Sequence, residues 1–279
     1  MTDISRQFYD ELLADLEHNR LVLPTLPEVA LKVREVVDDP DSSIADLVKI
    51  IVSDPALSAR LIQVANSPLM RAGRKIESVD AAVSRLGMRI VRDLATSMVM
   101  QQMFQATSDV TDQRLRQLWE HSTEVAAICH ALAGQFTKLN PEQALLAGLV
   151  HDIGAMPILT KAEDFPELLQ DEKALDWVIR ELHPRVGGAI LRSWNFPPEL
   201  VDVAEQHENL AYNSSAVDFV DVVIVANLQS YLGGSHPLAE QDLSKIPAFA
   251  KLGLSPDVNV IEMEGTGDAI RETQQLLSI

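Results

Sequence analysis

Histidines and one aspartate in the second half of the chain are the residues best suited to chemistry. They are His121, His130, the adjacent pair His151-Asp152, His183 and His207. Imidazole nitrogens combined with a carboxylate oxygen suit Mn, Fe or Zn. Such an ion lowers the pKa of a bound water to make a nucleophile, and it can hold a phosphate group. The set therefore indicates a metal site, either one that still binds an ion or a former one.

Two of these histidines fall on one predicted helix, where spacing separates them. His121 lies three residues after Leu118 and four before Val125, on an apolar stripe, so it should point inward. His130 follows nine residues later, about 180° round the helix, and should face the opposite side. A lone inward histidine is more often a core residue bonded to neighbouring backbone than a ligand. The alternative of leftover core histidines therefore stays open.

The His151-Asp152 pair closes an apolar helix predicted over 142–151, just before Ile153-Gly154. Adjacent side chains point about 100° apart on a regular helix. At a helix end, both can reach one ion.

Helical spacing recurs along the rest of the chain. The region 77–104 should form two helices around Gly87, as a packing hairpin rather than a DNA-binding motif, and Pro184 and Pro197-Pro198 should open two more. The apolar run 219–228 could be a buried strand or a buried helix by its pattern alone. We expect a helix there, because no partner strand is evident.

Composition limits the partners. The formal net charge is -18, from 41 acidic and 23 basic residues. Such a surface repels phosphate backbones and anionic lipid, so we expect no nucleic acid and no membrane partner. The single Cys129 excludes an intrachain disulfide and should be a buried, inert thiol. The first residues lack a secretory pattern and apolar runs such as 222–226 are too short to span a bilayer, so we expect a cytoplasmic protein.

Several motifs together resemble a known family. GLVHDIG (148–154), with His121 upstream, resembles the HD superfamily of metal-dependent phosphohydrolases. VSDPALSARLIQVANSP (52–68) and IESVDAAVSRLGMRIVRDL (76–94) look like the HDOD family, a regulatory offshoot related to HD-GYP domains. The resemblance covers roughly residues 20 to 230.

The resemblance implies an all-α fold: an HD-like helical bundle with an N-terminal helical subdomain. A polar segment, 105–111, is the candidate boundary. We therefore expect an N-terminal subdomain at 1–107, the bundle at 108–232 and a C-terminal helical extension at 233–279. The surface between the subdomains is where a partner or ligand is expected.

The resemblance also implies a ligand set, with departures. His121 matches the first histidine of the HD pattern, and His151 and Asp152 match the pair itself. His183 and His207 resemble additional HD-GYP ligands. The closing aspartate aligns with Asn227, whose carbonyl oxygen carries no charge. Gln206 stands where a second adjacent histidine is usual, and Ala155 where a lysine is usual.

The resemblance implies a bacterial signal-transduction module, and these losses favour one that is not catalytic and acts through a protein partner, with a degenerate HD metal site. The alternative is a metal-dependent phosphohydrolase with an altered site, in which Asp152 would be the catalytic residue. No cofactor is certain; a divalent Fe, Mn or Zn ion and a nucleotide or phosphate ligand are compatible with the set.

Overall fold

The structure is a computed structural model that describes residues 3–18, 20–24, 27–67, 75–100, 103–104, 109–233, 237–263 and 265–277. Within these ranges the regular elements are helices and no strand occurs, which confirms the all-α prediction. Three sequence features extend outside the described residues: Pro68 of the Asn-Ser-Pro block, most of the polar segment 105–111, and part of the predicted C-terminal extension.

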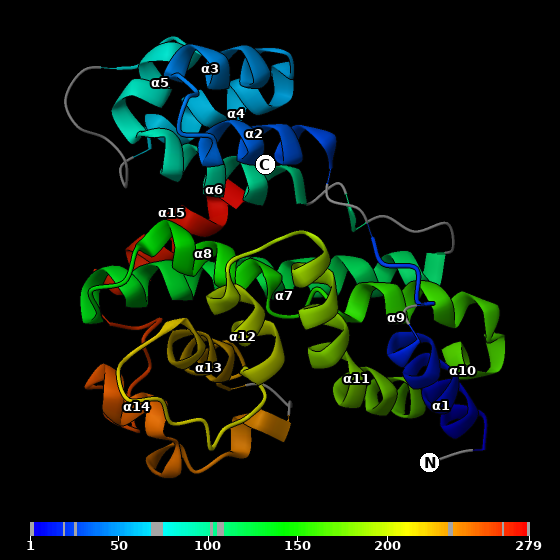
Figure 1. The fold of residues 1–279 in the computed structure, drawn as a ribbon. Coiled ribbons are helices and arrows are strands. Elements are labelled where there is room, and N and C mark those ends of the chain that lie inside the picture. Colours follow the sequence, from blue (N-terminus) through cyan, green and yellow to red (C-terminus); the bar gives the residue numbers. More distant parts are fainter. Residues whose placement is uncertain are drawn as a thin grey trace.

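In the part of the N-terminal half that the structure describes lie the α-helices α1 (Asp3–Glu17), α2 (Glu28–Asp38), α3 (Ile44–Val52), α4 (Pro55–Ala65), α5 (Val79–Leu86) and α6 (Met88–Met100). Helices α2 to α6 pack on one another as a lobe at the top of Figure 1. Gly87 joins α5 to α6 with φ of +83°, a backbone that glycine adopts readily, so the predicted two-helix hairpin is confirmed.

Helix α1 lies apart from this lobe. It packs against α10 and α11 at the opposite end of the molecule, where Lys161 pairs with Glu11 and Asp15 of α1. The predicted subdomain at 1–107 therefore includes a helix that packs with the bundle. The boundary itself falls between described segments and stays a prediction.

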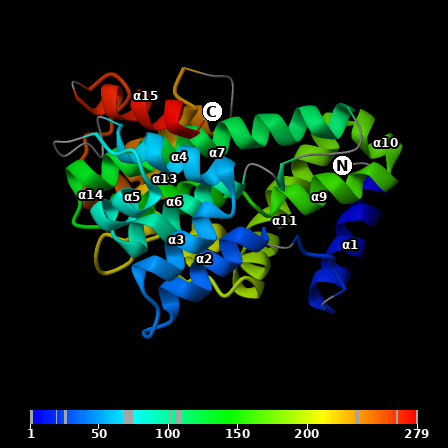
Figure 2. The ribbon, with the colours of Figure 1, turned by 90° about the horizontal axis from the view of Figure 1, so that it is seen from above.

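The second half forms a bundle around two central helices, α7 (Asp109–Phe136) and α8 (Pro141–Val150), which pack most extensively on each other. Around them lie α9 (Ala155–Lys161), η2 (Ala162–Asp164), α10 (Pro166–Gln170), α11 (Glu172–Ser193), α12 (Pro198–Gln206) and α13 (Phe219–Ser230). The chain ends with η3 (Pro237–Glu240), η4 (Leu243–Lys245), α14 (Pro247–Leu252) and α15 (Thr266–Leu277). Helix α15 returns to lie along α7 (Figures 1 and 2).

The run 219–228 is helical, as expected, and buried on every side as α13. One helix boundary was predicted wrongly: Pro184 does not open a helix but lies inside α11. The helix continues because buried Leu182, Val186 and Ile190 hold it against its neighbours. That burial outweighs the loss of one hydrogen bond at the proline, about 3 kcal/mol.

Among the described residues, one stretch, Pro141–Asp164, is long and apolar enough to cross a membrane. It spans α8, the turn after it, α9 and η2, and 83% of its most apolar window is buried inside the fold. The stretch is therefore apolar because it lies in the core of the fold. Cys129 is also buried, and burial raises the pKa of its thiol.

Candidate metal centre

The turn between α8 and α9 carries the His-Asp pair. Helix α8 is capped at its start by Asn140 and is buried on all sides from Ala144 onward, so its end lies deep in the bundle. His151 follows as its C-cap and is fully buried, while Asp152 is 17% exposed. The helix end therefore delivers a carboxylate and an imidazole to the interior together, as the sequence predicted.

Close packing behind this turn brings in the next histidine. A Cβ on Gly154 would lie 2.0 Å from the carbonyl oxygen of His183 and 2.4 Å from the amide nitrogen of Gly187. Only a glycine permits such an approach of α11 to the turn. The same contact places His183, on α11, beside Asp152.

Asp152 lies between two pairs of histidines. Its Oδ1 is 3.2 Å from Nε2 of His183 and 3.1 Å from Nε2 of His207. Its Oδ2 is 3.4 Å from Nε2 of His151 and 3.7 Å from Nε2 of His121. Two sets of metal-ligating atoms result, His121/His151/Asp152 and Asp152/His183/His207, each within 4.8 Å. The fold brings together five of the six predicted ligands, with the four histidines arranged around the Asp152 carboxylate.

Three of the imidazoles are oriented by backbone carbonyls. Nδ1 of His151 donates to Gly148 O at 2.6 Å, and Nδ1 of His183 donates to Ile179 O at 2.8 Å. Nδ1 of His207 lies 3.1 Å from both Val203 O and Ala204 O. A carbonyl can only accept, so each neutral ring carries its proton on Nδ1 and turns the Nε2 lone pair toward Asp152. This is the arrangement that prepares histidines for metal binding.

The converging lone pairs conflict when nothing lies between them. Nε2 of His183 and Nε2 of His207 are only 3.0 Å apart, and two acceptors at that distance need a proton or a cation between them. Nε2 of His151 is buried and makes no hydrogen bond among the described residues. A polar atom left unpaired in the interior is costly, so the site is built to receive a positive charge.

The pKa shifts reflect the same electrostatics. Burial alone would raise the pKa of Asp152, but the adjacent His151 and His183 hold that pKa well below its usual value. Burial lowers the pKa of His151 to about 3, although Asp152 opposes this. Burial also acts to lower the pKa of His183, but Asp152 reverses it and the net shift is upward. Asp152 is therefore a carboxylate, and His151 a neutral base, near neutral pH.

Asn227, the sixth predicted ligand, is buried on α13, and its Oδ1 has no hydrogen-bond partner in the described part of the chain. Its neighbour one helical turn on, Tyr231, reaches the cluster by contacting His121, so the two share the face of α13 turned toward α7. Asn227 therefore stays a predicted ligand on this face of α13.

The two substituted positions contribute no charge. Gln206 accepts a hydrogen bond from the side chain of Asn209 and is half-buried at the end of α12. Ala155 is buried at the start of α9. His130, excluded by its spacing, is buried on α7 and belongs to neither histidine set.

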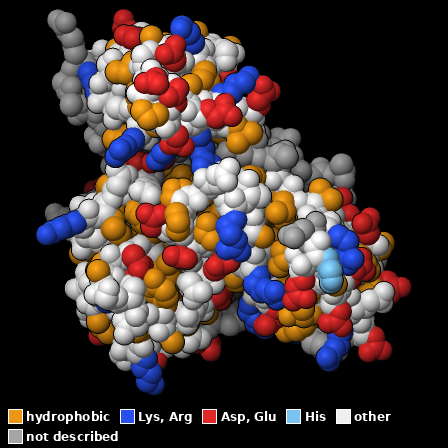
Figure 3. Space-filling model, viewed as in Figure 1, with side chains coloured by type: hydrophobic (Ala, Val, Ile, Leu, Met, Phe, Trp, Pro, Cys, Tyr) orange, Lys and Arg blue, Asp and Glu red, His pale blue; other side chains and the backbone are white. Residues whose placement is uncertain are grey.

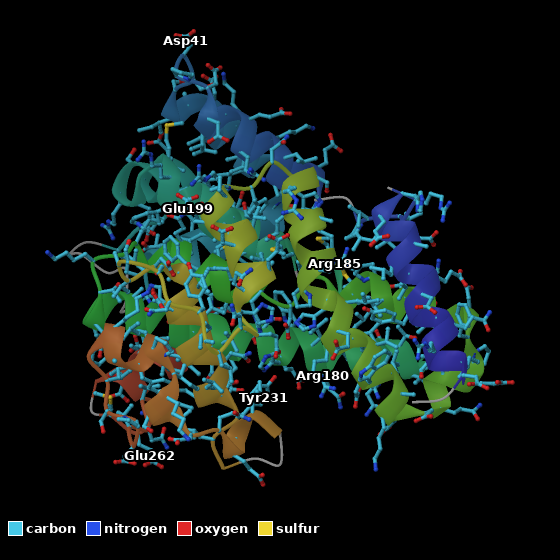
Figure 4. The ribbon with its side chains drawn as sticks, turned by 60° about the horizontal axis from the view of Figure 1, so that its bottom comes forward. Asp41, Arg180, Arg185, Glu199, Tyr231 and Glu262 are labelled. Atoms are coloured by element: carbon cyan, nitrogen blue, oxygen red, sulfur yellow. The ribbon has the colours of Figure 1, made fainter. Side chains whose placement is uncertain are left out.

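Sequence reasoning missed Tyr231, which is the C-cap of α13 and is labelled in Figure 4. Its hydroxyl lies 3.2 Å from Nε2 of His121, and the two rings are nearly parallel. Burial and the charge of Asp152 raise the pKa of Tyr231, so its hydroxyl is protonated in the site as it stands. The four-residue spacing from Asn227 is the signal that could have identified it.

Comparison with known proteins agrees with the sequence motifs. The HDOD domain profile matches residues 23–210. An uncharacterized protein of Treponema pallidum (strain Nichols) is 26% identical over 246 residues, which are 81% of this chain and 46% of that protein. The chain spans less than half the length of the curated relatives it matches.

Two solved structures share the fold across nearly the whole chain. A candidate metal-dependent phosphohydrolase from Shewanella amazonensis SB2B is 34% identical, with a TM-score of 0.87 over 99% of this chain and 100% of that one. An HDOD domain protein of unknown function from Geobacter sulfurreducens is 24% identical, with a TM-score of 0.69 over 97% of each chain. The second similarity concerns the fold alone.

Proposed function

This chain belongs to the HDOD domain family, and from that premise we propose that it is a bacterial signalling module whose degenerate HD site binds a metal ion and whose output is a protein interaction. In this proposal the ion has a structural or regulatory role, not a catalytic one. His121, His151, Asp152, His183 and His207 hold it, with Asn227 beside them. The buried apolar stretch and the single buried thiol are compatible with action in the cytoplasm.

One observation carries the metal-binding part. Buried ring nitrogens of His151, His183 and His207, with their protons directed outward to carbonyls, converge on the carboxylate of Asp152. Leftover core histidines would instead be expected to satisfy both ring nitrogens. The donor set of several imidazoles and one carboxylate fits Fe, Mn or Zn. When bound, such an ion supplies positive charge that can polarise a phosphate group or a water.

The non-catalytic part rests on the charges that are absent. Asn227 gives no second carboxylate, Gln206 gives no further imidazole, and Ala155 gives no cation to stabilise phosphate charge. What this chain's own residues still do is limited: Asp152 holds negative charge at the centre, with the imidazoles of His151 and His183 beside it. In this proposal a nucleotide or phosphate that binds at the ion acts as a signal and is not cleaved.

A metal-dependent phosphohydrolase is the second candidate, and the position of Asp152 favours it. Each of its oxygens faces a different histidine pair, so the carboxylate could bridge two ions. Paired ions are used by enzymes that displace groups at phosphorus. The similarity to the candidate phosphohydrolase of Shewanella amazonensis SB2B supports the same reading.

Metal binding is tested on protein purified without chelator, then stripped and titrated with Mn²⁺, Fe²⁺ or Zn²⁺. We expect the melting temperature to rise with at least one of these ions, because a ligand that binds only the folded state stabilises it by about 2.7 kcal/mol at 100 times its Kd. His151→Ala and Asp152→Asn should abolish the rise, whereas His18→Ala, at an exposed histidine on the N-terminal segment, should keep it. Absence of bound metal together with no thermal response would contradict the proposal.

Catalysis is tested with the metal-loaded protein on a generic phosphodiester and on cyclic dinucleotides. We expect no turnover above background. Robust turnover that disappears in His151→Ala would instead establish the phosphohydrolase.

The effect of the missing carboxylate on ion affinity can be tested by introducing one in Asn227→Asp. A carboxylate at this buried position should tighten divalent-ion binding on the order of tenfold, comparable to effects of single groups around metal ligands. Asn209→Asp, on the exposed loop after α12, is the matched control and should leave affinity unchanged. Unchanged affinity in Asn227→Asp would remove Asn227 from the site.

A further inference from the structure

Helices α11 and α12 pack on each other as a hairpin, and the two ends of this hairpin are held by different parts of the molecule. At one end, His183 on α11 and His207, the C-cap of α12, place their Nε2 atoms 3.0 Å apart beside Asp152. At the other end, the turn 194–197 joins the two helices and meets the lobe of α2 to α6. The α11–α12 hairpin therefore connects the metal centre to the lobe.

The two helices are closely packed between these ends. A Cβ on Gly187 of α11 would lie 3.3 Å from Cβ of Ala204 of α12, which is closer than an ordinary contact. Arg192 of α11 also pairs with Glu205 of α12 at 2.7 Å. Densely packed interiors transmit a displacement instead of absorbing it. A change in how the helices are held at the histidines therefore reaches the turn.

The turn itself is a stiff cap on the end of α11. Asn195 has a left-handed backbone, with φ of +53°. Its amide donates to Arg192 O at 3.0 Å, and the amide of Phe196 donates to Leu191 O at 2.9 Å. These two bonds are those of a Schellman motif, which ties the residues after a helix to its last turn. The turn therefore moves with α11 and not independently of it.

The lobe holds this turn by its backbone. The guanidinium of Arg34, on α2, donates to Trp194 O at 2.7 Å and to Asn195 O at 2.6 Å. It also lies 4.2 Å from the centroid of the Phe196 ring. Nε1 of Trp194 donates in return to Pro24 O, shortly before α2 begins, at 2.9 Å. Because the carbonyls that accept from Arg34 belong to one stiff turn, a rotation of the hairpin displaces both of them together.

We propose that the α11–α12 hairpin transmits ion occupancy at His183 and His207 to the lobe, so that a bound ion and the docked lobe stabilise each other. The proposal rests on the proposed metal-binding function and names its regulation. With a cation between the two Nε2 atoms, the repulsion of their lone pairs is replaced by attraction, and the helices are held together at that end. The hairpin then presents its carbonyls to Arg34 in one orientation. Coupling between two sites is reciprocal, so docking of the lobe raises ion affinity by the factor by which the ion favours docking.

The experiment uses full-length protein stripped of metal and then titrated with Zn²⁺. Wild type, Arg34→Ala and Arg34→Lys are compared, because the lysine keeps the positive charge but lacks the planar fork that serves two carbonyls. Lys32→Ala is the matched control, since Lys32 is exposed on the same helix and pairs only locally, with Glu28. Zn²⁺ affinity is measured by chelator competition, and hydrogen exchange of α2 to α6 is measured with and without Zn²⁺.

We expect Zn²⁺ to slow hydrogen exchange in α2 to α6 of the wild type and of Lys32→Ala on the order of tenfold, a usual size for coupling between sites. In Arg34→Ala and Arg34→Lys, Zn²⁺ affinity should fall and the effect of Zn²⁺ on the lobe should shrink. Exchange in the wild-type lobe that ignores Zn²⁺, or wild-type Zn²⁺ affinity in both Arg34 variants, overturns the coupling while metal binding stands. If the wild type binds neither Zn²⁺ nor Mn²⁺ nor Fe²⁺, the proposed function fails as well.

Discussion

At the scale of single residues, the centre is defined by where each histidine places its proton. His151, His183 and His207 each donate Nδ1–H to a carbonyl of the preceding helical turn. This contact is local, so each helix end or turn orients its own imidazole before any ion arrives. Asp152 is the residue that these rings share, through both of its oxygens.

His130 shows how a histidine behaves outside this set, and it gives a pH prediction. Burial lowers its pKa to about 4, below the unfolded value of 6.5. Between these values the unfolded chain binds a proton that the folded chain does not, so stability falls as pH falls through that window. From about pH 7 to about pH 5, His130 alone should reduce the free energy of unfolding by about 2 kcal/mol.

The measurement is urea unfolding at both pH values for the wild type, His130→Gln and His18→Gln. His130→Gln should remove about this part of the pH dependence, whereas His18→Gln, at an exposed position, should retain it. Equal pH dependence in all three proteins would show that burial of His130 has no such effect.

At the scale of elements, the site depends on helices that approach more closely than ordinary side chains allow. The turn after α8 meets α11 at Gly154, and α8 crosses α7 at Gly148, where a Cβ would lie 2.6 Å from Cα of Ala126. Helix α11 also runs through Pro184, between Arg180 and Arg185, which are labelled in Figure 4. The position of His183 therefore results from packing of α11 as a whole, not from its local sequence.

Substitution of Gly154 tests this close approach. In Gly154→Ala, the added methyl group would collide with the backbone of His183 and Gly187, neither of which is a flexible side-chain end. We expect a loss of about 1–3 kcal/mol in unfolding free energy, because α9 and α11 must separate. Metal affinity should also fall, since His183 moves with α11.

Gly134→Ala is the matched control, because its Cβ would make only an ordinary contact, 3.6 Å from Pro141, on the exposed side of α7. That change should stabilise the protein by about 1 kcal/mol through helix propensity. Denaturant unfolding and metal titration of both variants provide the comparison. A Gly154→Ala protein as stable as wild type would disprove the packing argument.

At the scale of the molecule, the lobe of α2 to α6 is joined to the bundle through α6 against α8 and through Arg34. The guanidinium of Arg34 donates to the carbonyls of Trp194 at 2.7 Å and Asn195 at 2.6 Å, and it lies over the ring of Phe196. These residues link α11 to α12, the helices of His183 and His207. Lys and Arg side chains lie along this seam in Figure 3, and Arg34 and Arg92 line a cavity of about 290 Å³ there.

Arg34→Ala should therefore loosen the lobe. Two hydrogen bonds from a charged donor are lost, which should cost about 2 kcal/mol or more. Hydrogen exchange should become faster in α2 to α6 and in the α11–α12 turn, while α7 and α13 keep their protection. Lys32→Ala, at an exposed position on the same helix, should not change this pattern. If hydrogen exchange in α2 to α6 is equally fast in the wild type and in Arg34→Ala, Arg34 does not hold the lobe against the bundle.

The sequence by itself determined the all-α class and the HDOD family, because helical periodicity and short motifs are local properties of the chain. Spacing alone separated His130 from His121, and the pattern at 219–228 was resolved correctly as a helix. The sequence-based prediction failed at Pro184, since the proline signal is local whereas the burial that keeps α11 intact comes from distant helices.

Only the tertiary structure decided that both oxygens of Asp152 face histidine pairs and that Tyr231 stacks on His121. It also decided that α1 packs with the bundle rather than with α2 to α6. These relations join residues from helices far apart in the chain. They depend on how closely the helices approach, which no local pattern encodes.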